Sequence, residues 1–266
     1  MKKAAAESTD QQQVKQPRPR LGIMLAATFL AMIVIAGAVM FINRQDDAEQ
    51  SATPATPDSA SVNGDDRPTE LDRLGRIVYV PDNAAGDVLD KTSETSEDSA
   101  PDVEWQRLSR STEITIARDY PFSADAGPWE VTDGVAHGFA HSSQGAALAG
   151  IHAFLGVGQG GEKAAQAMKQ FMADPEAKKA AQHMLDNPTG PQSPEAPWTS
   201  TFAAYTVLSH DDDSALIRYA CPAGEGFSQV DVKLVWADGD WQLAPGAAVS
   251  QNAPVSEDEV ASWLQL

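Results

Sequence analysis

One uninterrupted apolar run, Leu21–Ile42, constrains what this chain can become more than any other feature. Its 22 residues contain no charge and no proline, and Thr28 is its one strong hydrogen-bonding side chain. As a helix rising about 1.5 Å per residue, the run reaches roughly 33 Å, enough to cross a hydrocarbon core of about 30 Å. Its apolar side chains cover the whole circumference, unlike those of an amphipathic helix on a soluble core. The run therefore predicts a transmembrane helix.

The competing interpretation is a cleaved signal peptide, whose apolar region usually spans about 7–15 residues before a small-x-small cleavage site. Ala36–Ala38 has that pattern, but the apolar residues Val39–Ile42 follow it, so we favour a retained anchor. Only Arg44 follows the run closely, whereas five basic residues precede it: Lys2, Lys3, Lys15, Arg18 and Arg20. Because positive loops stay inside, we expect a single-pass cell-membrane protein with a cytoplasmic N-terminus and an extracellular C-terminal domain.

The segments on either side of the run differ in composition and divide the chain. Residues 1–20 are polar and basic, and predict a disordered cytoplasmic tail. Residues 43–103 are rich in Ser, Thr, Pro, Asp and Glu, and predict a self-repelling acidic linker. Within this linker, Leu71–Val80 is an apolar island that predicts a short strand, at the edge of the domain or against a partner. Residues 104–250 are expected to form the extracytoplasmic domain.

The formal charge of −19 restricts the partners of the outer part. An acidic surface repels nucleic-acid phosphates and anionic lipid, so we expect no direct contact with nucleic acid. Cys221 is the single cysteine, which excludes an intrachain disulfide and leaves core packing to stabilise the domain. It lies in a strand-like segment, where a buried thiol is the simplest interpretation; a nucleophile would need a histidine partner that the sequence does not place.

An alanine-rich helix is expected first within the domain. Ser142 or Ser143 can cap it, and it ends near Val157 where glycines accumulate over residues 156–161. This glycine-rich segment is followed by no Gly-Lys-Ser/Thr and preceded by no strand, so a helix stop is favoured over a phosphate-binding loop.

Two further helices are expected before the chain becomes extended. One covers Glu162–Met172. Asp174 and Pro175 have the N-cap and first-turn pattern that begins the other, which ends at Asn187. Upstream of the alanine-rich helix, Trp129–Val131 reads as a short extended piece.

The spacing of apolar residues changes to two after residue 200, which predicts half-buried antiparallel strands. These strands are expected at Thr201–Leu208, Ala215–Cys221 and Val230–Trp236. Asp238-Gly239 predicts a tight hairpin turn with positive φ, leading to a returning strand around Trp241.

The last segment, residues 251–266, is expected to be an amphipathic helix, because Ser256 and Glu259 have the spacing of a capping box. Helices followed by a strongly curved antiparallel sheet predict an α+β fold in the form of a cone.

Two parts of the domain resemble known families. The first resembles a family of actinobacterial single-pass membrane proteins of uncharacterised function that occur with conjugative-element genes. The residues that carry this resemblance are Tyr120–Ser123, Gly127-Pro128, Gly138–His141 and Gly145–Ala149. The second is similar to NTF2-like domains, including the extracytoplasmic domains of VirB8/TcpC-type conjugation proteins. The residues that carry that similarity are Tyr205, Ala215, Val230–Trp236 and Asp238–Trp241.

The resemblance implies helices packed on a curved antiparallel sheet, and a scaffold subunit of a type IV secretion or conjugation channel. It supplies no catalytic residue.

Side chains suited to metal binding or acid–base chemistry are scattered. His137 and His141 are four residues apart, which suits zinc only on a helix, and Gly138 argues against one. His152 lies on the alanine-rich helix, where a satisfied or exposed histidine is the simpler interpretation. Asp211–Asp213 is better explained as a polar turn than as a calcium loop, because the twelve-residue spacing of such a loop is absent.

Cones of the steroid-isomerase type need a carboxylate base inside an apolar cavity. Asp231 alternates with apolar neighbours and is expected on the solvent face. No Ser/His/Asp set has the setting of a nucleophile elbow. We therefore assign no catalytic residue, no cofactor and no metal ligand, and expect a protein that is not an enzyme.

These observations favour a membrane-anchored scaffold or assembly subunit. Leu21–Ile42 would contact the lipid bilayer, and the outer domain would contact other envelope or secretion-channel proteins, or copies of itself. The alternative is a small-ligand-binding or enzymatic NTF2-like module at the cell surface, which would need an apolar cavity with convergent ionisable side chains. A cone filled by Trp and Leu would argue against this alternative. A weaker third hypothesis is a regulator of cell-wall or secretion factors.

The topology is directly testable. Protease added to intact protoplasts should digest the C-terminal domain, because the positive-inside rule places that domain outside. The measurement is an immunoblot against a C-terminal epitope, with a cytoplasmic protein as the control for intact membranes. A protected C-terminal domain would invert the topology.

Overall fold

The computed structural model describes residues 67–92, 99–108, 118–188, 201–246 and 250–266. The expected tail, the apolar run Leu21–Ile42 and residues 43–66 of the linker lie outside this part of the chain, and their assignments stay predictions. Within the described ranges, none of the helices is long and apolar enough to cross a membrane.

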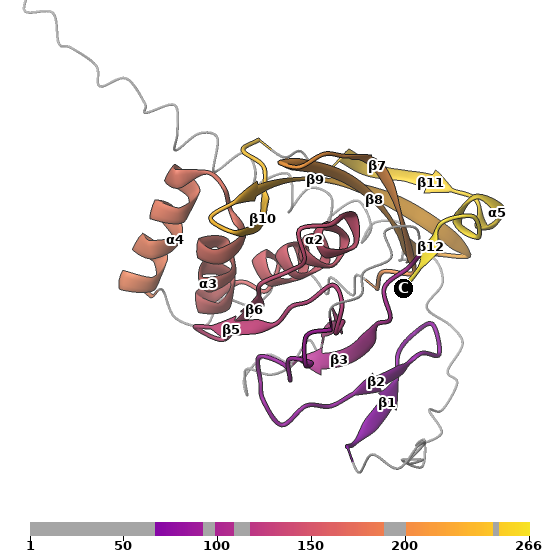
Figure 1. The fold of residues 1–266 in the computed structure, drawn as a ribbon, viewed down its shortest axis with the longest axis horizontal. Helices are drawn as coiled ribbons and strands as arrows, with labels where there is room; N and C mark the ends of the chain where they lie inside the picture. The colour runs from indigo at the N-terminus through magenta and orange to yellow at the C-terminus, as the bar shows by residue number, and fades with distance from the viewer. Residues whose placement is uncertain (1–66, 93–98, 109–117, 189–200, 247–249) are drawn as a thin grey trace, which may run out of the picture.

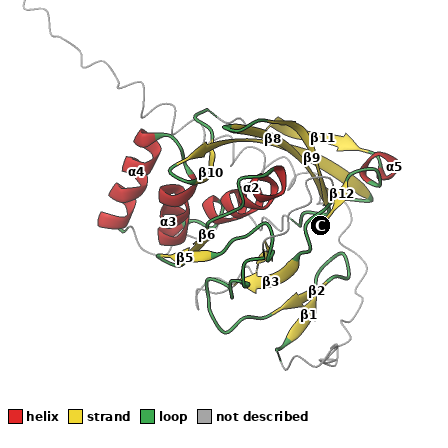
Figure 2. Ribbon diagram, viewed as in Figure 1, coloured by secondary structure: helices red, strands yellow, loops and turns green. Residues whose placement is uncertain are grey.

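The centre of the domain is helix α2 (Ser143–Val157), which packs against a six-stranded sheet on one side and strand β4 of a four-stranded sheet on another. Figures 1 and 2 show α2 beneath the large sheet, with α3 and α4 beside it and the smaller sheet below. Thirteen of its fifteen residues are buried. The helix is therefore the element around which the other layers assemble.

The large sheet is antiparallel, in the order β10-β9-β8-β7-β12, with β11 also paired to β9. Its strands are β7 (Ala204–His210), β8 (Ser214–Ala223), β9 (Gly226–Ala237), β10 (Asp240–Leu243), β11 (Ser250–Val255) and β12 (Leu264–Gln265). The three longest confirm the strands expected from the period of two. Asp238 and Gly239 have φ of 56° and 82°, which confirms the predicted hairpin turn between β9 and β10.

The smaller sheet, in the order β1-β2-β3-β4, begins earlier than expected. Its strands are β1 (Thr69–Leu71), β2 (Ile77–Tyr79), β3 (Glu104–Leu108) and β4 (Arg118–Phe122). The apolar island of the linker thus forms a β1–β2 hairpin, and β2 pairs with β3 in parallel. The boundary expected at residue 104 is wrong, because β3 needs this earlier strand as its neighbour; the described fold starts at Arg67.

The remaining elements follow the predicted pattern closely. A separate hairpin joins β5 (Glu130–Thr132) to β6 (Val135–His137), where an extended piece was expected. The Ser142 side chain caps α2 by accepting the N–H of Gly145 at 3.2 Å. The other helices are α3 (Gly161–Phe171) and α4 (Pro175–Asp186), and Asp174 caps the latter as predicted. The strands β1–β6 nevertheless precede the helices, so the order of elements differs from the predicted layout of helices followed by strands.

The expected helix over residues 251–266 is wrong. The segment forms β11, a four-residue helix α5 (Glu257–Val260) and β12. Pro254 lies before the Ser256 cap, outside any helix that begins there, and the free edges of β9 and β7 pair with β11 and β12 instead. The capping box itself is real but short, since the Ser256 hydroxyl accepts the N–H of Glu259 at 3.3 Å.

Small residues allow α2 to be enclosed. A Cβ on Gly150 would lie 2.2 Å from the Tyr219 hydroxyl oxygen, and a Cβ on Gly156 would lie 2.8 Å from Cβ of Ala167 on α3. The sheet and α3 therefore approach the backbone of α2 directly. The Tyr219 hydroxyl uses this closeness to donate to the carbonyl oxygen of Ala147 at 2.7 Å.

Gly150→Ala should lower the free energy of unfolding by about 2 kcal/mol, because the added methyl group collides with a buried hydroxyl that cannot move away. Gly226→Ala is the matched control, since nothing lies within 4 Å of a Cβ there; its effect should stay within about 0.5 kcal/mol. Denaturant unfolding measures both variants. Equal effects would contradict the close approach, and Tyr219→Phe should relieve part of the cost of Gly150→Ala.

Candidate functional site

The space between α2 and the large sheet is filled by large side chains. Trp241, Tyr219 and Phe202 are 0–1% exposed and lie among the apolar side chains of α2 and the sheet. Phe202 and Tyr219 meet edge-on with centroids 5.3 Å apart. This interior is where the predicted cone would hold a ligand, and here it is packed as a core.

A buried carboxylate fastens the start of α2 to the β9–β10 hairpin. The side chain of Asp240 accepts the backbone N–H groups of Gly138 at 2.8 Å, Phe139 at 3.1 Å and Trp241 at 2.9 Å. Burial raises the pKa of Asp240, while these N–H groups oppose the shift. The indole N–H of Trp241 also donates to the carbonyl oxygen of Ala140 at 2.9 Å. Asp240 is therefore a positioning group for the loop before α2.

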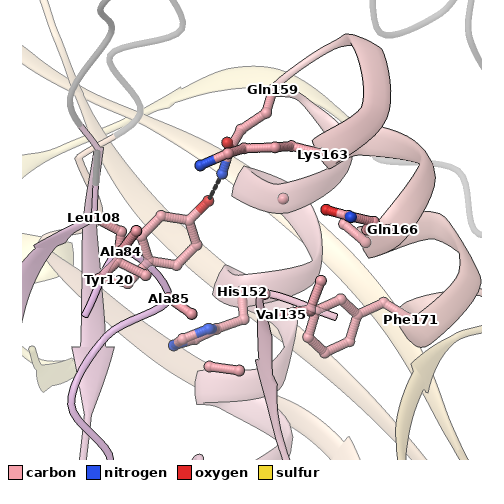
Figure 3. Close-up of a pocket in the computed structure, with 14 residues that line it drawn as sticks. Ala84, Ala85, Leu108, Tyr120, Val135, His152, Gln159, Lys163, Gln166 and Phe171 are labelled. Atoms are coloured by element: carbon pink, nitrogen blue, oxygen red, sulfur yellow. Dashed lines mark hydrogen bonds between the residues drawn. The ribbon is translucent and has the colours of Figure 1, made fainter. Parts of the chain in front are cut away.

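A small cavity of about 40 Å³ lies on another side of α2, and Figure 3 shows the side chains around it. His152 of α2, Tyr120 of β4 and Phe171 of α3 line it, together with Gln159 from the turn after α2. The Gln159 amide donates to the Tyr120 hydroxyl at 2.5 Å. Because one water needs about 10–15 Å³ by this measure, the cavity accommodates about three or four waters.

Three ionisable side chains line the cavity, and two of them, His152 and Tyr120, are uncharged at neutral pH. Burial lowers the pKa of His152 to about 4 and raises the pKa of Tyr120 to about 12. Nε2 of His152 lies 2.8 Å from the carbonyl oxygen of Pro121, which makes Nε2 the protonated nitrogen of the neutral ring. The ring centroid is 5.0–5.4 Å from those of Tyr120, Phe122 and Phe139. A histidine with so low a pKa is a weak general base, and its surroundings are those of a core residue.

A buried arginine stabilises the other end of α2. Arg118 of β4 is 5% exposed and donates to the carbonyl oxygens of Leu155 at 3.2 Å and Gly158 at 2.9 Å. The last turn of α2 has no basic residue of its own. Arg118 therefore supplies, from a neighbouring strand, the positive charge that favours a helix C-terminus.

The residues that the sequence singled out for metal binding have separate structural roles. Nε2 of His137 lies 2.9 Å from the Thr132 hydroxyl oxygen. His141 stacks on Trp236 with ring centroids 4.0 Å apart, and its Nε2 contacts the carbonyl oxygen of Asp212. No group of three or more His, Cys, Asp or Glu in the described ranges is placed to hold a metal ion.

The candidate acids and the cysteine are likewise used by the fold. Asp211 accepts the N–H groups of Asp213 and Ser214, which lower its pKa, so the predicted polar turn is confirmed. Asp231 is half-buried and pairs with Arg218 at 2.7 Å. Cys221 is buried as expected, and burial raises its pKa to about 12, which leaves the thiol protonated and unreactive.

Exposed apolar side chains gather on one hairpin. Leu71, Leu74 and Ile77 are 60%, 39% and 42% exposed, and all belong to the β1–β2 hairpin. Leu71 and Ile77 are opposite each other in the β1–β2 register, so they share one face. This set of three residues, the hairpin tip, is a candidate contact surface.

The sequence did not indicate the roles of Arg118, Tyr120 and Gln159. A signal existed for Arg118, because an alanine-rich helix without a basic last turn needs a cation from elsewhere. No comparable signal points to the cavity, whose walls come from separate segments.

Residues 77–265 match a protein family described as a domain of unknown function, DUF8175. The chain belongs to this family. The matched range covers β2 through β12, so the DUF8175 domain includes nearly all of the described fold. Comparison with curated proteins and with solved structures found no match.

The stability of this DUF8175 domain should depend on pH through His152. The unfolded chain takes up a proton on this ring below about pH 6.5, whereas the folded ring does so only near pH 4. Stability is therefore fully present above pH 6.5 and falls as the pH is lowered, by about 2 kcal/mol from this group between pH 7 and pH 5.

Denaturant unfolding at the two pH values checks the expectation. In His152→Gln the loss of unfolding free energy between pH 7 and pH 5 should be smaller by that amount than in the unsubstituted protein. The glutamine amide can still donate to the carbonyl oxygen of Pro121, but it does not titrate. An equal loss in both proteins would contradict the buried, neutral state of His152.

Proposed function

We propose that this protein is a membrane-anchored extracytoplasmic assembly subunit that acts through protein–protein contacts, in a conjugation or type IV secretion-like system. The observation that carries the proposal is the filled interior, where Trp241, Tyr219 and Phe202 occupy the space next to α2. A domain packed in this way offers its outer surfaces for recognition. The apolar run Leu21–Ile42 supplies the anchor.

The NTF2-like assignment is part of this proposal. Three features support it: consecutive antiparallel strands from β7 to β10, the Asp238-Gly239 hairpin, and helix α2 packed on one face of that sheet. The resemblance of the second half to conjugation-channel domains supports the secretion-like context.

The outer face of the large sheet is the surface that we assign to the protein partner. One end of it is covered by the C-terminal segment, where Val260 and Trp263 pack with Ala204 and Ala220. None of the residues that the structure describes is packed over the other end in the same way. Leu208 is 42% exposed beside a register irregularity in β7, and Leu216 and Val235 are half-buried on neighbouring strands. These apolar positions, Leu208, Leu216 and Val235, form the open sheet face.

The alternative of a ligand-binding or catalytic module has two observations in its favour. One is an open surface hollow whose lining includes Asp102, Glu104 and Asp125, and the other is the cavity beside α2. His152 and Tyr120 converge on the cavity beside α2. Its volume of about 40 Å³ suits water rather than an organic ligand, and both groups are neutral at pH 7. The assembly role is therefore the better supported of the two.

Photo-cross-linking in intact cells tests the assembly role. A photoreactive amino acid at Leu208 should give discrete adducts with envelope proteins, because the side chain lies at the proposed contact. Val88, in the connection between β2 and β3, is the matched control at 41% exposure against 42% for Leu208. Adducts are read by immunoblot and identified by mass spectrometry.

Val88 should give few adducts. If the immunoblots show only uncross-linked monomer at both positions in every growth condition, the result counts against an assembly subunit. Equal adducts from both would leave the role in place but remove the open sheet face as the contact.

A further inference from the structure

The hairpin tip differs in character from the rest of this acidic domain. Its aliphatic side chains, Leu71, Leu74 and Ile77, project from a short two-stranded turn, with Leu71 the most exposed of the large apolar residues described. Arg73 is exposed beside Leu74. Such a combination of protruding aliphatic groups and arginine is typical of surfaces that rest in the headgroup region of a bilayer.

The β1–β2 hairpin carries no net charge although the chain carries −19. Residues 69–79 contain two acids, Glu70 and Asp72, and two arginines, Arg73 and Arg76. Glu70 pairs with Arg107 of β3. Asp72 is satisfied within the turn: it accepts the N–H groups of Leu74 and Arg76 and pairs with the Arg76 guanidinium at 2.7 Å. The tip therefore presents no unsatisfied negative charge to lipid phosphates.

The hairpin is held firmly by the domain behind it. The Arg76 guanidinium donates to the carbonyl oxygens of Phe202 at 2.8 Å and Leu266 at 3.0 Å, and lies 3.8 Å from the ring centroid of Trp105. Val78, at the centre of β2, is fully buried. The exposed side chains are thus fixed in place before any contact, which reduces the entropy lost on binding.

The predicted anchor brings the hairpin tip close to a bilayer. Between Ile42 and Arg67 lie 24 residues, which span at most about 80 Å when extended. Residue 67 leads directly into β1. A surface tethered at this distance needs only weak affinity, because the tether keeps its local concentration at the membrane high.

The size of the hairpin tip favours lipid over a protein partner. A stable protein–protein interface buries about 800 Å² on each side, far more than three partly exposed aliphatic side chains provide. Shallow insertion of a few apolar groups needs no such area, because the free energy of insertion adds to that of the anchor.

We propose that the β1–β2 hairpin tip is a second membrane contact, which rests in the headgroup region of the bilayer that holds the anchor. This inference rests on the proposed membrane-anchored function. It assigns the partner of the hairpin as a lipid surface and leaves the open sheet face to protein.

The test uses the full chain reconstituted in vesicles of phosphatidylcholine and phosphatidylglycerol, at fewer than one chain per vesicle. An environment-sensitive fluorophore is attached at Leu74→Cys, in a Cys221→Ala background. Met184→Cys on α4 is the matched control, because Leu74 and Met184 are both 39% exposed. Quenching by lipids that carry a spin label near the headgroup should be about twofold stronger at position 74 than at position 184.

Leu71→Asp should lower the quenching at position 74 to the level at position 184, since it removes the most exposed aliphatic group and adds a repelled charge. Leu208→Asp, on the open sheet face, should leave that quenching unchanged. Leu71→Trp should increase the quenching at position 74 and leave that at position 184 unchanged, whereas misfolding would change both.

Equal quenching at positions 74 and 184 in a chain that stays in the vesicles after a carbonate wash would overturn the inference alone. A chain that washes off would overturn the anchor and the inference together. Cross-links between Leu74→Cys copies at higher density, without lipid quenching, would replace the bilayer by a second copy of the chain.

Discussion

The rest of the fold depends on the enclosure of α2. A helix buried on nearly every side must have neighbours that reach its backbone, and glycine and alanine make that approach possible. Gly150 admits the Tyr219 hydroxyl and Gly156 admits α3. Residues from other elements form hydrogen bonds at both ends of the helix. Asp240 accepts N–H groups of the loop before it, and Arg118 donates to carbonyl oxygens at its C-terminal end. Sheets, hairpin and helices meet because they share this one element.

This arrangement leaves little interior for chemistry. The region next to the large sheet is packed with aromatic side chains, and the cavity beside His152 has the size of a few water molecules. Three buried polar groups, Asp240, Arg118 and His152, are each satisfied by backbone atoms of the fold. In the proposed assembly role recognition uses outer surfaces, and two of those described differ in character: the open sheet face and the hairpin tip.

Local signals in the sequence predicted the parts that depend on local physics. Ser142 and Asp174 caps, the Asp238-Gly239 turn and the alternation through β8 and β9 were predictable because each involves neighbours along the chain. The C-terminal segment was not, since β11 and β12 form only where β9 and β7 leave edges free. The cavity was missed for the same reason, because the residues that line it lie far apart in sequence. A strand in Leu71–Val80 was predicted, but its parallel pairing with β3 was not. The transmembrane and NTF2-like assignments stay predictions.

The bonds of Arg76 have a mechanical consequence. The guanidinium joins the turn between β1 and β2 to the main chain at Phe202 and Leu266, which lie at the β7–β12 edge of the large sheet. A pull arriving through residue 67 would be shared by the Arg67–Glu104 and Glu70–Arg107 ion pairs, the β1–β2 pairing and the bonds of Arg76. In the proposed anchored protein, movement of the bilayer relative to a bound neighbour would therefore reach β3 through the two ion pairs, and the edge of the large sheet through Arg76.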